Sequence, residues 1–455
     1  MSRYTSATDA DRSEMLATIG VQSIEELFTD IPSSLRLERP PNLGEGLSEL
    51  EVFEELRALA SRNVSTDDEI SFLGAGMYDH YIPALVDSIT QRSEFLTPYT
   101  PYQPEISQGG LQAMFEYQTA ISELTGLPVS NASVYDGPSA VAAAAYVAKL
   151  SRGRSKFVVS HGVHPHSREV LRTLARGWNM EVQETPLKHG LTDLPELDEQ
   201  VSAVIVQQPN FLGAVEDLDA VAGAAAEAGA LSICACDPLS LALLKPPGEC
   251  GVEIAVGEGQ ALGNRLDFGG PSFGFFATTE ELIRRIPGRI AGETRDTEGR
   301  RGFVLTLQTR EQHIRRERAT SNITTAQALN ALAGVIYLSW LGRRGFVELA
   351  ELIVQRTAYA RNRLCAIEGV ELLHQQPVVR EFAITLPVPV QDAVAKCRER
   401  GVNPGYPLGR DYPEHSDGLL VALTERRTRS DIDRLVDVLA DAVTAGTPAF
   451  QGVAR

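Results

Sequence analysis

Short apolar runs alternate with helical segments between residues 61 and 300. Three of these runs have the length and continuity of buried strands: Lys156–Ser160, Ala203–Gln207 and Leu231–Cys236. A helix predicted over Leu218–Gly229 lies between the last two runs and completes a β–α–β unit. A further, alanine-rich helix is predicted over 139–150. Because strands and helices alternate in this way, the pattern predicts an α/β domain built on a mainly parallel sheet.

The pattern changes near residue 324. An apolar helix is predicted from Thr324 to Gly342, and it connects the large domain to a smaller one. The smaller domain is predicted to contain a helix, two strands and a last helix: Val347–Cys365, Phe382–Leu386, Leu419–Leu423 and a segment from Ser430 onward. We therefore expect four regions along the chain: 1–60, 61–323, 324–345 and 346–455.

The first region, residues 1–60, is predicted to be a helical arm. Ser23 followed by Glu26 has the spacing of a capping box, in which the two side chains and the two backbone N–H groups bond reciprocally. Prolines at 32, 40 and 41 then interrupt any regular helix. The arm should therefore consist of short helices separated by extended chain.

Composition and charge restrict the partners of the chain. Its 455 residues carry 60 acidic and 42 basic side chains, and the net charge of -18 argues against nucleic acid or an anionic membrane as a general partner. No apolar run of about 18 residues predicts a membrane span, and the first residues lack the apolar core of a secretion signal. Five cysteines without metal-ligand spacing suit a reducing compartment, so we expect a cytoplasmic protein with no bound metal.

The segment 72–140 contains two features that favour a binding role. The turn Gly74-Ala75-Gly76 lacks large side chains, so its backbone can approach another group closely. The loop 99–105 follows Pro98 and contains Pro101 and Pro104, which restrict the backbone and exclude regular helix. A loop held this stiffly is suited to presenting its tyrosines and its glutamate to a ligand or partner. The alternative is a surface loop that packs on its own rings.

Four unusual strings resemble one protein family. The longest runs from Phe72 to Ala140 and begins FLGAGMYDHYIPALVDSITQRSEFLTPYTPYQPEISQGG. The others are Ile19–Phe28 (IGVQSIEELF), Leu307–Arg316 (LQTREQHIRR) and Ala319–Ile323 (ATSNI). They are similar to the α subunit of the two-subunit glycine dehydrogenase (decarboxylating), the P-protein of the glycine cleavage system. The resemblance implies an α/β fold of the pyridoxal-phosphate (PLP)-dependent transferase class, like that of aspartate aminotransferase.

A PLP enzyme of this fold needs an acid beside the pyridine nitrogen, a phosphate cradle at a helix N-terminus and a ring stacked on the cofactor. Asp237 follows a predicted strand and could supply the acid, or it could cap the turn that follows. Asp136 and Ser139 open a predicted helix that could receive phosphate, although ordinary helix capping is favoured. His164, together with His161, could supply the ring, or could belong to a structural loop.

The same chemistry needs a lysine that holds PLP covalently. In active relatives the lysine follows the acid by about 20–25 residues, as the resemblance implies, and here Gln260 or Ala261 occupies that place. The five lysines of the chain lie elsewhere: Lys149, Lys156, Lys188, Lys245 and Lys396. An amide cannot replace the amine, and a protonated guanidinium is a poor nucleophile. We therefore expect no covalently bound PLP on this chain.

The resemblance implies that a partner β subunit carries the PLP. It also implies an assembly of two α and two β chains, with a single αβ pair as the open alternative. The holoenzyme would decarboxylate glycine and transfer the aminomethyl group to the lipoamide of the H-protein. We expect the stiff loop to contribute to the partner's site through five side chains: Tyr99, Tyr102, Gln103, Glu105 and Gln108. Two alternatives are a purely structural or regulatory subunit of this fold and a self-sufficient PLP enzyme, which the missing lysine disfavours.

An arginine-rich stretch runs from Arg284 to Arg318, with ten arginines against five acidic residues. The ordinary interpretation is a solvated face with local ion pairs. The alternative is a positive patch that attracts an acidic carrier protein.

Overall fold

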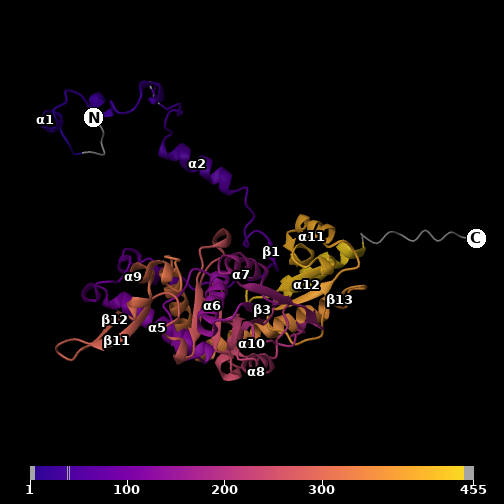
Figure 1. Cartoon of the computed structure of the whole chain (residues 1–455). Coiled ribbons are helices and arrows are strands. Elements are labelled where there is room, and N and C mark those ends of the chain that lie inside the picture. The colour runs from indigo at the N-terminus through magenta and orange to yellow at the C-terminus, as the bar shows by residue number, and fades with distance from the viewer. Residues whose placement is uncertain (1–5, 38, 40, 445–455) are drawn as a thin grey trace, which may run out of the picture. The chain divides into compact units, whose positions relative to one another are not determined.

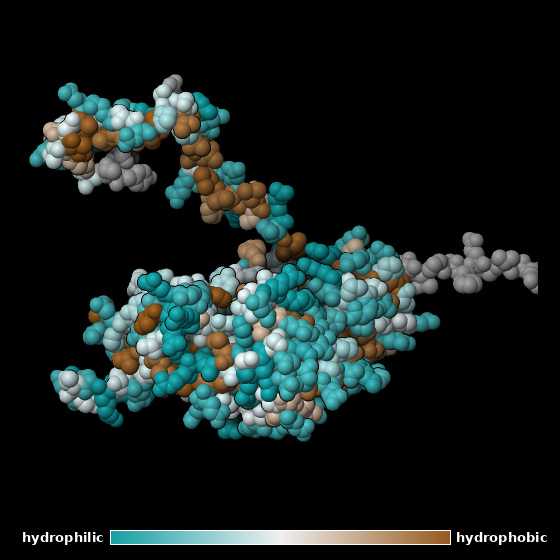
Figure 2. Space-filling model, in the orientation of Figure 1, coloured by the Kyte–Doolittle hydropathy of each residue, from teal (hydrophilic) through white to brown (hydrophobic). Residues whose placement is uncertain are grey.

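The computed structural model describes residues 6–37, 39 and 41–444, which divide into two compact units at residues 64 and 65. The first unit contains the helices α1 (Asp9–Ile19) and α2 (Glu49–Ala60), with short 3-10 turns between them. Neither helix buries a single residue, and hydrophobic side chains lie exposed along this unit (Figure 2). Within its described residues, the first unit therefore has no hydrophobic core of its own.

The predicted capping box at Ser23 is wrong. The segment Ile24–Phe28 is a 3-10 helix, and the N–H of Glu26 donates to the backbone oxygen of Ser23 at 3.3 Å instead of to its side chain. Complete capping boxes occur instead at Thr8 and Ser48, each with an acidic residue three positions later.

The second unit, which Figure 1 shows as the larger body of the chain, is built on a seven-stranded sheet. The strand order of this sheet is β2-β10-β9-β8-β7-β3-β4. In chain order its strands are β2 (Val129–Ser130), β3 (Lys156–Ser160), β4 (Glu181–Thr185), β7 (Val201–Gln208), β8 (Leu231–Cys236), β9 (Ile254–Glu258) and β10 (Gly274–Thr278). β10 pairs antiparallel with β9 and with β2, and all the other pairs in this sheet are parallel. The predicted strands at 156–160 and 231–236 are confirmed with the same bounds, and the mainly parallel sheet is confirmed.

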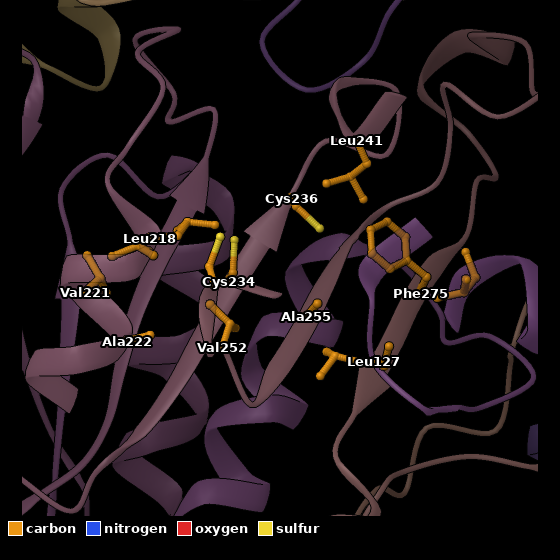
Figure 3. Packing of buried hydrophobic residues seen from close by; sticks show 14 of the residues in the cluster. Leu127, Leu218, Val221, Ala222, Cys234, Cys236, Leu241, Val252, Ala255 and Phe275 are labelled. Atoms are coloured by element: carbon orange, nitrogen blue, oxygen red, sulfur yellow. The ribbon is translucent and has the colours of Figure 1, made fainter. Parts of the chain in front are cut away.

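Helices cover both faces of this sheet because its central strands are apolar on both sides. Along β7, Val204 and Val206 pack in one cluster with α5 (Gln108–Thr125) and α8 (Leu218–Glu227), part of which Figure 3 shows. The alternate residues Ala203 and Ile205 pack in a second cluster with α6 (Gly137–Arg152) and α7 (Pro165–Gly177). The two-residue period of the strand thus distributes its side chains between two cores.

The C-terminal part is a smaller layer attached through the long helix α10 (Ala328–Leu364). The sequence predicts two helices here, and the structure contains one helix that is interrupted at Gly342, whose φ is 60°. The small sheet has the order β13-β14-β17-β16, with β13 (Glu371–Leu372), β14 (Glu381–Thr385), β16 (Tyr406–Pro407) and β17 (Gly418–Ala422). The helices α11 (Val390–Glu399) and α12 (Arg429–Thr444) pack on it.

Short elements connect these layers. The remaining helices are α3 (Ala84–Thr90), α4 (Ser93–Leu96) and α9 (Gln312–Arg315). The remaining strands are β1 (Ile70–Ser71) paired with β15 (Val402–Asn403), β5 (Leu187–Lys188) paired with β6 (Leu191–Thr192), and β11 (Ile290–Arg295) paired with β12 (Arg301–Thr306). Among the described residues, no helix has the length and apolar character needed to cross a membrane.

Candidate functional site

A cavity of about 450 Å³ lies where the carboxyl ends of three strands meet two helix N-termini. Gln207 of β7, Asp237 after β8 and Glu258 of β9 line it from the sheet. Asp136 lines it from the start of α6, and His164 from the start of α7. Parallel α/β sheets place their ligand sites at this edge, so the cavity is the first candidate for a functional site.

Asp136 and Ser139 form a capping box at the start of α6. The Ser139 N–H donates to Asp136 Oδ1 at 2.8 Å, and the Asp136 N–H donates to the Ser139 hydroxyl oxygen at 3.2 Å. Asp136 lines the 450 Å³ cavity, whereas Ser139 lines a different one. The two residues therefore make the capping contacts that the sequence favoured.

Asp237 caps the turn after β8, as one of the two sequence interpretations expects, and also pairs with an arginine. Its Oδ1 accepts the Leu239 N–H at 3.1 Å, which caps the turn after β8. The same oxygen accepts a hydrogen bond from Arg380 Nη2 at 2.5 Å, with side-chain exposures of 13% for the aspartate and 4% for the arginine. The carboxylate is therefore already paired with a cation.

Arg380, which precedes β14, joins the smaller layer to the cavity. Its guanidinium lies 3.3 Å from the ring centroid of Tyr78, and its Nη1 is 2.8 Å from His80 Nε2. The Tyr78 hydroxyl in turn donates to Glu381 at 2.5 Å. Burial, followed by the Glu381 charge, raises the pKa of Tyr78 well above its ordinary value, and burial raises the pKa of Glu381.

Gln260 and Ala261 occupy different environments. The Gln260 side chain is 1% exposed, and its amide clamps the Tyr78 backbone by accepting from the N–H at 2.8 Å and donating to the oxygen at 3.0 Å. It also donates to the Asn264 oxygen at 2.8 Å. Ala261 lines the cavity, whereas Gln260 is not among the lining residues. Of the two candidates for the lysine's place, the alanine therefore faces the open space.

The glycine turn makes the close backbone approach that the sequence predicts. A Cβ on Gly74 would lie 2.4 Å from Glu381 Oε1, and a Cβ on Gly76 would lie 2.9 Å from His164 Nε2. The Ala75 N–H between them donates to Glu381 at 2.7 Å. A side chain on Gly74 would therefore meet Glu381, which accepts this hydrogen bond, and one on Gly76 would meet the His164 ring.

Only one of the two candidate histidines, His164 and His161, lines the 450 Å³ cavity. His164 lines the cavity, its Nε2 lies 3.0 Å from the Ala75 oxygen, and burial lowers its pKa to about 4. His161 lies outside the cavity lining, with its ring centroid 4.9 Å from that of Tyr412. No group of three or more metal-ligating side chains occurs in the described part of the chain, and the absence of a metal stays a prediction.

The stiff loop lies at a second cavity, of about 330 Å³. Tyr102 lines this cavity together with Arg289, Arg310 and Glu311 of the arginine-rich stretch, and its ring meets His313 edge-on at a centroid distance of 5.3 Å. Arg300 and Arg301 of the same stretch instead form exposed ion pairs at the tip of the β11–β12 hairpin, as expected for a solvated face. The arginine-rich stretch therefore divides between a cavity wall and a surface.

The other loop residues differ in exposure. Tyr99 is 90% exposed, and Gln103 and Glu105 are exposed beside the short helix 104–106. Gln108 bridges to β12 by accepting from the Phe303 N–H at 2.8 Å and donating to its oxygen at 2.9 Å. Gln108 thus anchors the loop, while the tyrosines and the glutamate remain available.

None of the residues that line the 450 Å³ cavity is a lysine. Lys156 pairs with Asp198, and Lys245 pairs with Asp219, each at 2.6 Å. Lys149 lies over the Tyr146 ring on α6. The remaining two lysines are on β5 and α11. All five lysine side chains, which carry the primary amines that could hold PLP, therefore lie outside the lining of this cavity.

Sequence and structure comparisons identify the family. A profile of the glycine cleavage system P-protein matches residues 2–439 of the chain. The chain belongs to the glycine cleavage system P-protein family. The probable glycine dehydrogenase (decarboxylating) subunit 1 of Geobacillus thermodenitrificans is 50% identical over 443 residues, which cover 96% of this chain and 99% of the relative. The protein of the same name from Carboxydothermus hydrogenoformans is 50% identical over 441 residues, with the same coverage of both chains.

Solved structures agree with this P-protein assignment. A crystal structure of glycine decarboxylase (P-protein) of the glycine cleavage system in inhibitor-bound form matches with a TM-score of 0.90 and 46% identity, covering 97% of this chain and 100% of that one. The cysteine desulfurase CsdA from Escherichia coli has a TM-score of 0.62 at 16% identity, covers 84% of this chain and 96% of that one, and is similar in fold alone. The predicted family, the PLP-dependent transferase fold and the assignment as a glycine dehydrogenase subunit are confirmed.

The residues that line the 450 Å³ cavity of this P-protein chain lack two features that a covalently held PLP requires. The cavity has no lysine to hold PLP, and Asp237 already pairs with Arg380. The residues therefore do not fit a covalently held PLP. Arg380, Tyr78 and Glu258 were not predicted as site residues from the sequence. Two of them carry a recognisable signal, because Glu258 is a charged residue at the end of an apolar strand and Arg380 is a charged residue just before one.

Proposed function

We propose that this chain is the α subunit of a two-subunit glycine dehydrogenase whose PLP is bound by a partner β subunit, in a cytoplasmic α2β2 assembly. The observation that carries the proposal is the cavity without a lysine in a chain of this family. PLP on the partner would accept the electrons when glycine loses CO2. The enzyme would then pass the aminomethyl group to the lipoamide of the H-protein.

The 330 Å³ cavity supports a contribution of this chain to the partner's site. Three of its polar atoms are buried and have no hydrogen-bond partner in the described part of the chain: Arg289 Nε, which lies 3.9 Å from Glu311 Oε2 in an ion pair, Arg310 Nε and Glu311 Oε1. An unpaired buried polar group costs about 1–3 kcal/mol, so such atoms are expected to be completed by water, a ligand or another chain. Tyr102 lies at the same cavity and is 47% exposed, so its ring is accessible to another chain.

Reconstitution tests the division of labour. The chain alone, the β subunit alone and their mixture are compared for exchange of the glycine carboxyl group with bicarbonate. We expect exchange from the mixture only. Full exchange by the β subunit alone would favour the purely structural or regulatory alternative. Exchange by this chain alone, with PLP trapped on one of its lysines by borohydride, would overturn the proposal.

Two substitutions test the loop. Tyr102→Phe and Glu105→Ala are introduced into the holoenzyme, and Tyr146→Phe, on α6 beside Trp178, is the matched control. If the loop reaches the partner's site, loss of one hydrogen bond lowers turnover on the order of tenfold while sedimentation shows normal assembly. Unchanged turnover in both loop variants would remove the loop from the site.

A further inference from the structure

The positive end of α6 is occupied by a carboxylate of the chain itself. Glu258, the last residue of β9, accepts the Gly137 N–H through Oε2 at 2.9 Å. Its Oε1 accepts the Gln260 N–H at 3.2 Å and the Ser272 hydroxyl. Burial raises the pKa of Glu258, and these three donors oppose that shift. In PLP-binding folds a helix N-terminus of this kind receives the phosphate.

No backbone donor remains in the first turn of α6. The Gly137 N–H bonds to Glu258, and Pro138 has no N–H. The Ser139 N–H bonds to Asp136 Oδ1 at 2.8 Å, and the Ala140 N–H bonds to the Asp136 oxygen at 3.0 Å. A phosphate would therefore find every N–H of this turn already used.

The space at this position is filled as well. A Cβ added to Gly137 would lie 3.0 Å from both the backbone nitrogen and the Cβ of Glu258. The helix start therefore packs directly on the end of β9. A phosphate could enter only if the Glu258 side chain moved away, and it would then lie beside the negative charge of Asp136.

A second charged pair at the same cavity has an analogous arrangement. The carboxylate of Asp237, which in this fold class would face a protonated pyridine nitrogen, is paired with Arg380 at 2.5 Å. The arginine side chain is 4% exposed and is held between the Tyr78 ring and His80. A cation of the chain thus lies where the positive end of the cofactor would lie.

We infer that Glu258 and Arg380 take the places of the two charged ends of PLP and close this cavity to the cofactor, independently of the missing lysine. The inference rests on the proposed function and deepens it, because it explains how the α subunit stays free of PLP next to a subunit that binds it. Restoring a lysine alone would then leave the cavity without PLP.

The test measures non-covalent binding of PLP and of inorganic phosphate to the purified full chain by equilibrium dialysis. Glu258→Ala removes the carboxylate and opens its space, and Glu258→Gln removes only the charge. Glu253→Ala is the matched control, because Glu253 is a half-buried carboxylate just before the other end of β9. Circular dichroism and thermal unfolding verify that each variant is folded.

We expect the wild type and Glu253→Ala to bind both probes with dissociation constants above about 1 mM. The dissociation constants of Glu258→Ala should be at least about tenfold lower. Wild-type binding as tight as that of Glu258→Ala would overturn the inference, and so would a folded Glu258→Ala that binds no better than Glu253→Ala. If Glu258→Ala does not fold, the same criteria apply to Glu258→Gln.

The outcome is distinguishable from failure of the proposed function. Non-covalent PLP binding by the wild type contradicts the inference but leaves the role of the β subunit intact. PLP trapped on a lysine of this chain by borohydride and located by peptide mapping, together with glycine exchange by the chain alone, contradicts the proposed function.

Discussion

Replacement of Arg380 by methionine tests whether the buried ion pair with Asp237 holds the two layers of the second unit together. Methionine retains much of the apolar stem of arginine and removes the charge. It leaves Asp237, which is 13% exposed, without its cation. It also removes the guanidinium from the Tyr78 ring, 3.3 Å from the centroid, and from His80.

The expected loss follows from this burial. Breaking a buried pair by removing one partner costs about 3–5 kcal/mol, because the remaining charge is desolvated and unpaired. The double variant Arg380→Met/Asp237→Asn leaves no unpaired charge, so it should recover roughly 2 kcal/mol of that loss. Arg265→Met is the control. Arg265 pairs with Asp87 at 2.6 Å, but the side chains are 48% and 37% exposed, and such pairs contribute only about 0–1 kcal/mol.

Urea unfolding, followed by circular dichroism and tyrosine fluorescence, gives the free energy of unfolding of the three variants relative to the wild type. We expect Arg380→Met to be far less stable than Arg265→Met and the double variant to lie between them. The reasoning is refuted if Arg380→Met is no less stable than Arg265→Met. It is also refuted if the additional Asp237→Asn change restores nothing, because the loss would then come from packing and not from an unpaired charge.

Three further predictions concern the same region. Gln260→Leu should cost about 2–4 kcal/mol in urea unfolding, because it leaves buried backbone groups unpaired, and a loss below 1 kcal/mol would contradict this. Gly213→Ala should lower the melting temperature strongly, since φ is +91° and its Cβ would lie 2.2 Å from the Glu381 oxygen, whereas Gly223→Ala meets nothing within 4 Å and should be neutral or stabilising. Burial lowers the pKa of His164 to about 4 in the folded chain, whereas the ordinary value is 6.5. Between these two pH values the unfolded chain therefore binds more protons than the folded chain, and the free energy of unfolding falls as the pH drops through that window. His164→Gln should reduce that fall by up to about 3 kcal/mol, and an unchanged pH profile would show that another group is responsible.

The large sheet could be predicted from the sequence because its strands are short and apolar on both faces. The strands 156–160 and 231–236 can be recognised from the sequence without tertiary context. What the sequence does not give is the order of the strands in the sheet and the register of their pairing. The long helix α10 was harder to predict. A glycine at 342 in a helical pattern reads as an end, but the chain continues on both sides of it as one interrupted helix.

The cavity could be predicted only in part. Asp136, His164 and Asp237 line it together because strand ends and helix starts converge at one edge of a parallel sheet. Their partners depend on contacts between distant segments, such as Asp237 and Arg380, which are 143 positions apart in the sequence. No local pattern encodes such a pairing. The sequence therefore identifies which groups could hold a cofactor but not whether the chain itself has already paired them.

The pairing of polar groups distinguishes the two cavities. In the 450 Å³ cavity, the carboxylates of Asp136, Asp237 and Glu258 all have donors from the same chain. In the 330 Å³ cavity, Arg289, Arg310 and Glu311 each retain a buried atom without a hydrogen-bond partner in the described residues, whereas among the described residues that line the 450 Å³ cavity only Arg380, through its Nε, does so. Because unpaired buried groups are costly, the second cavity is the one whose completion by another molecule would stabilise the protein most. Ligand or partner chemistry should therefore be sought at Tyr102 and its neighbours before the cavity at the sheet edge.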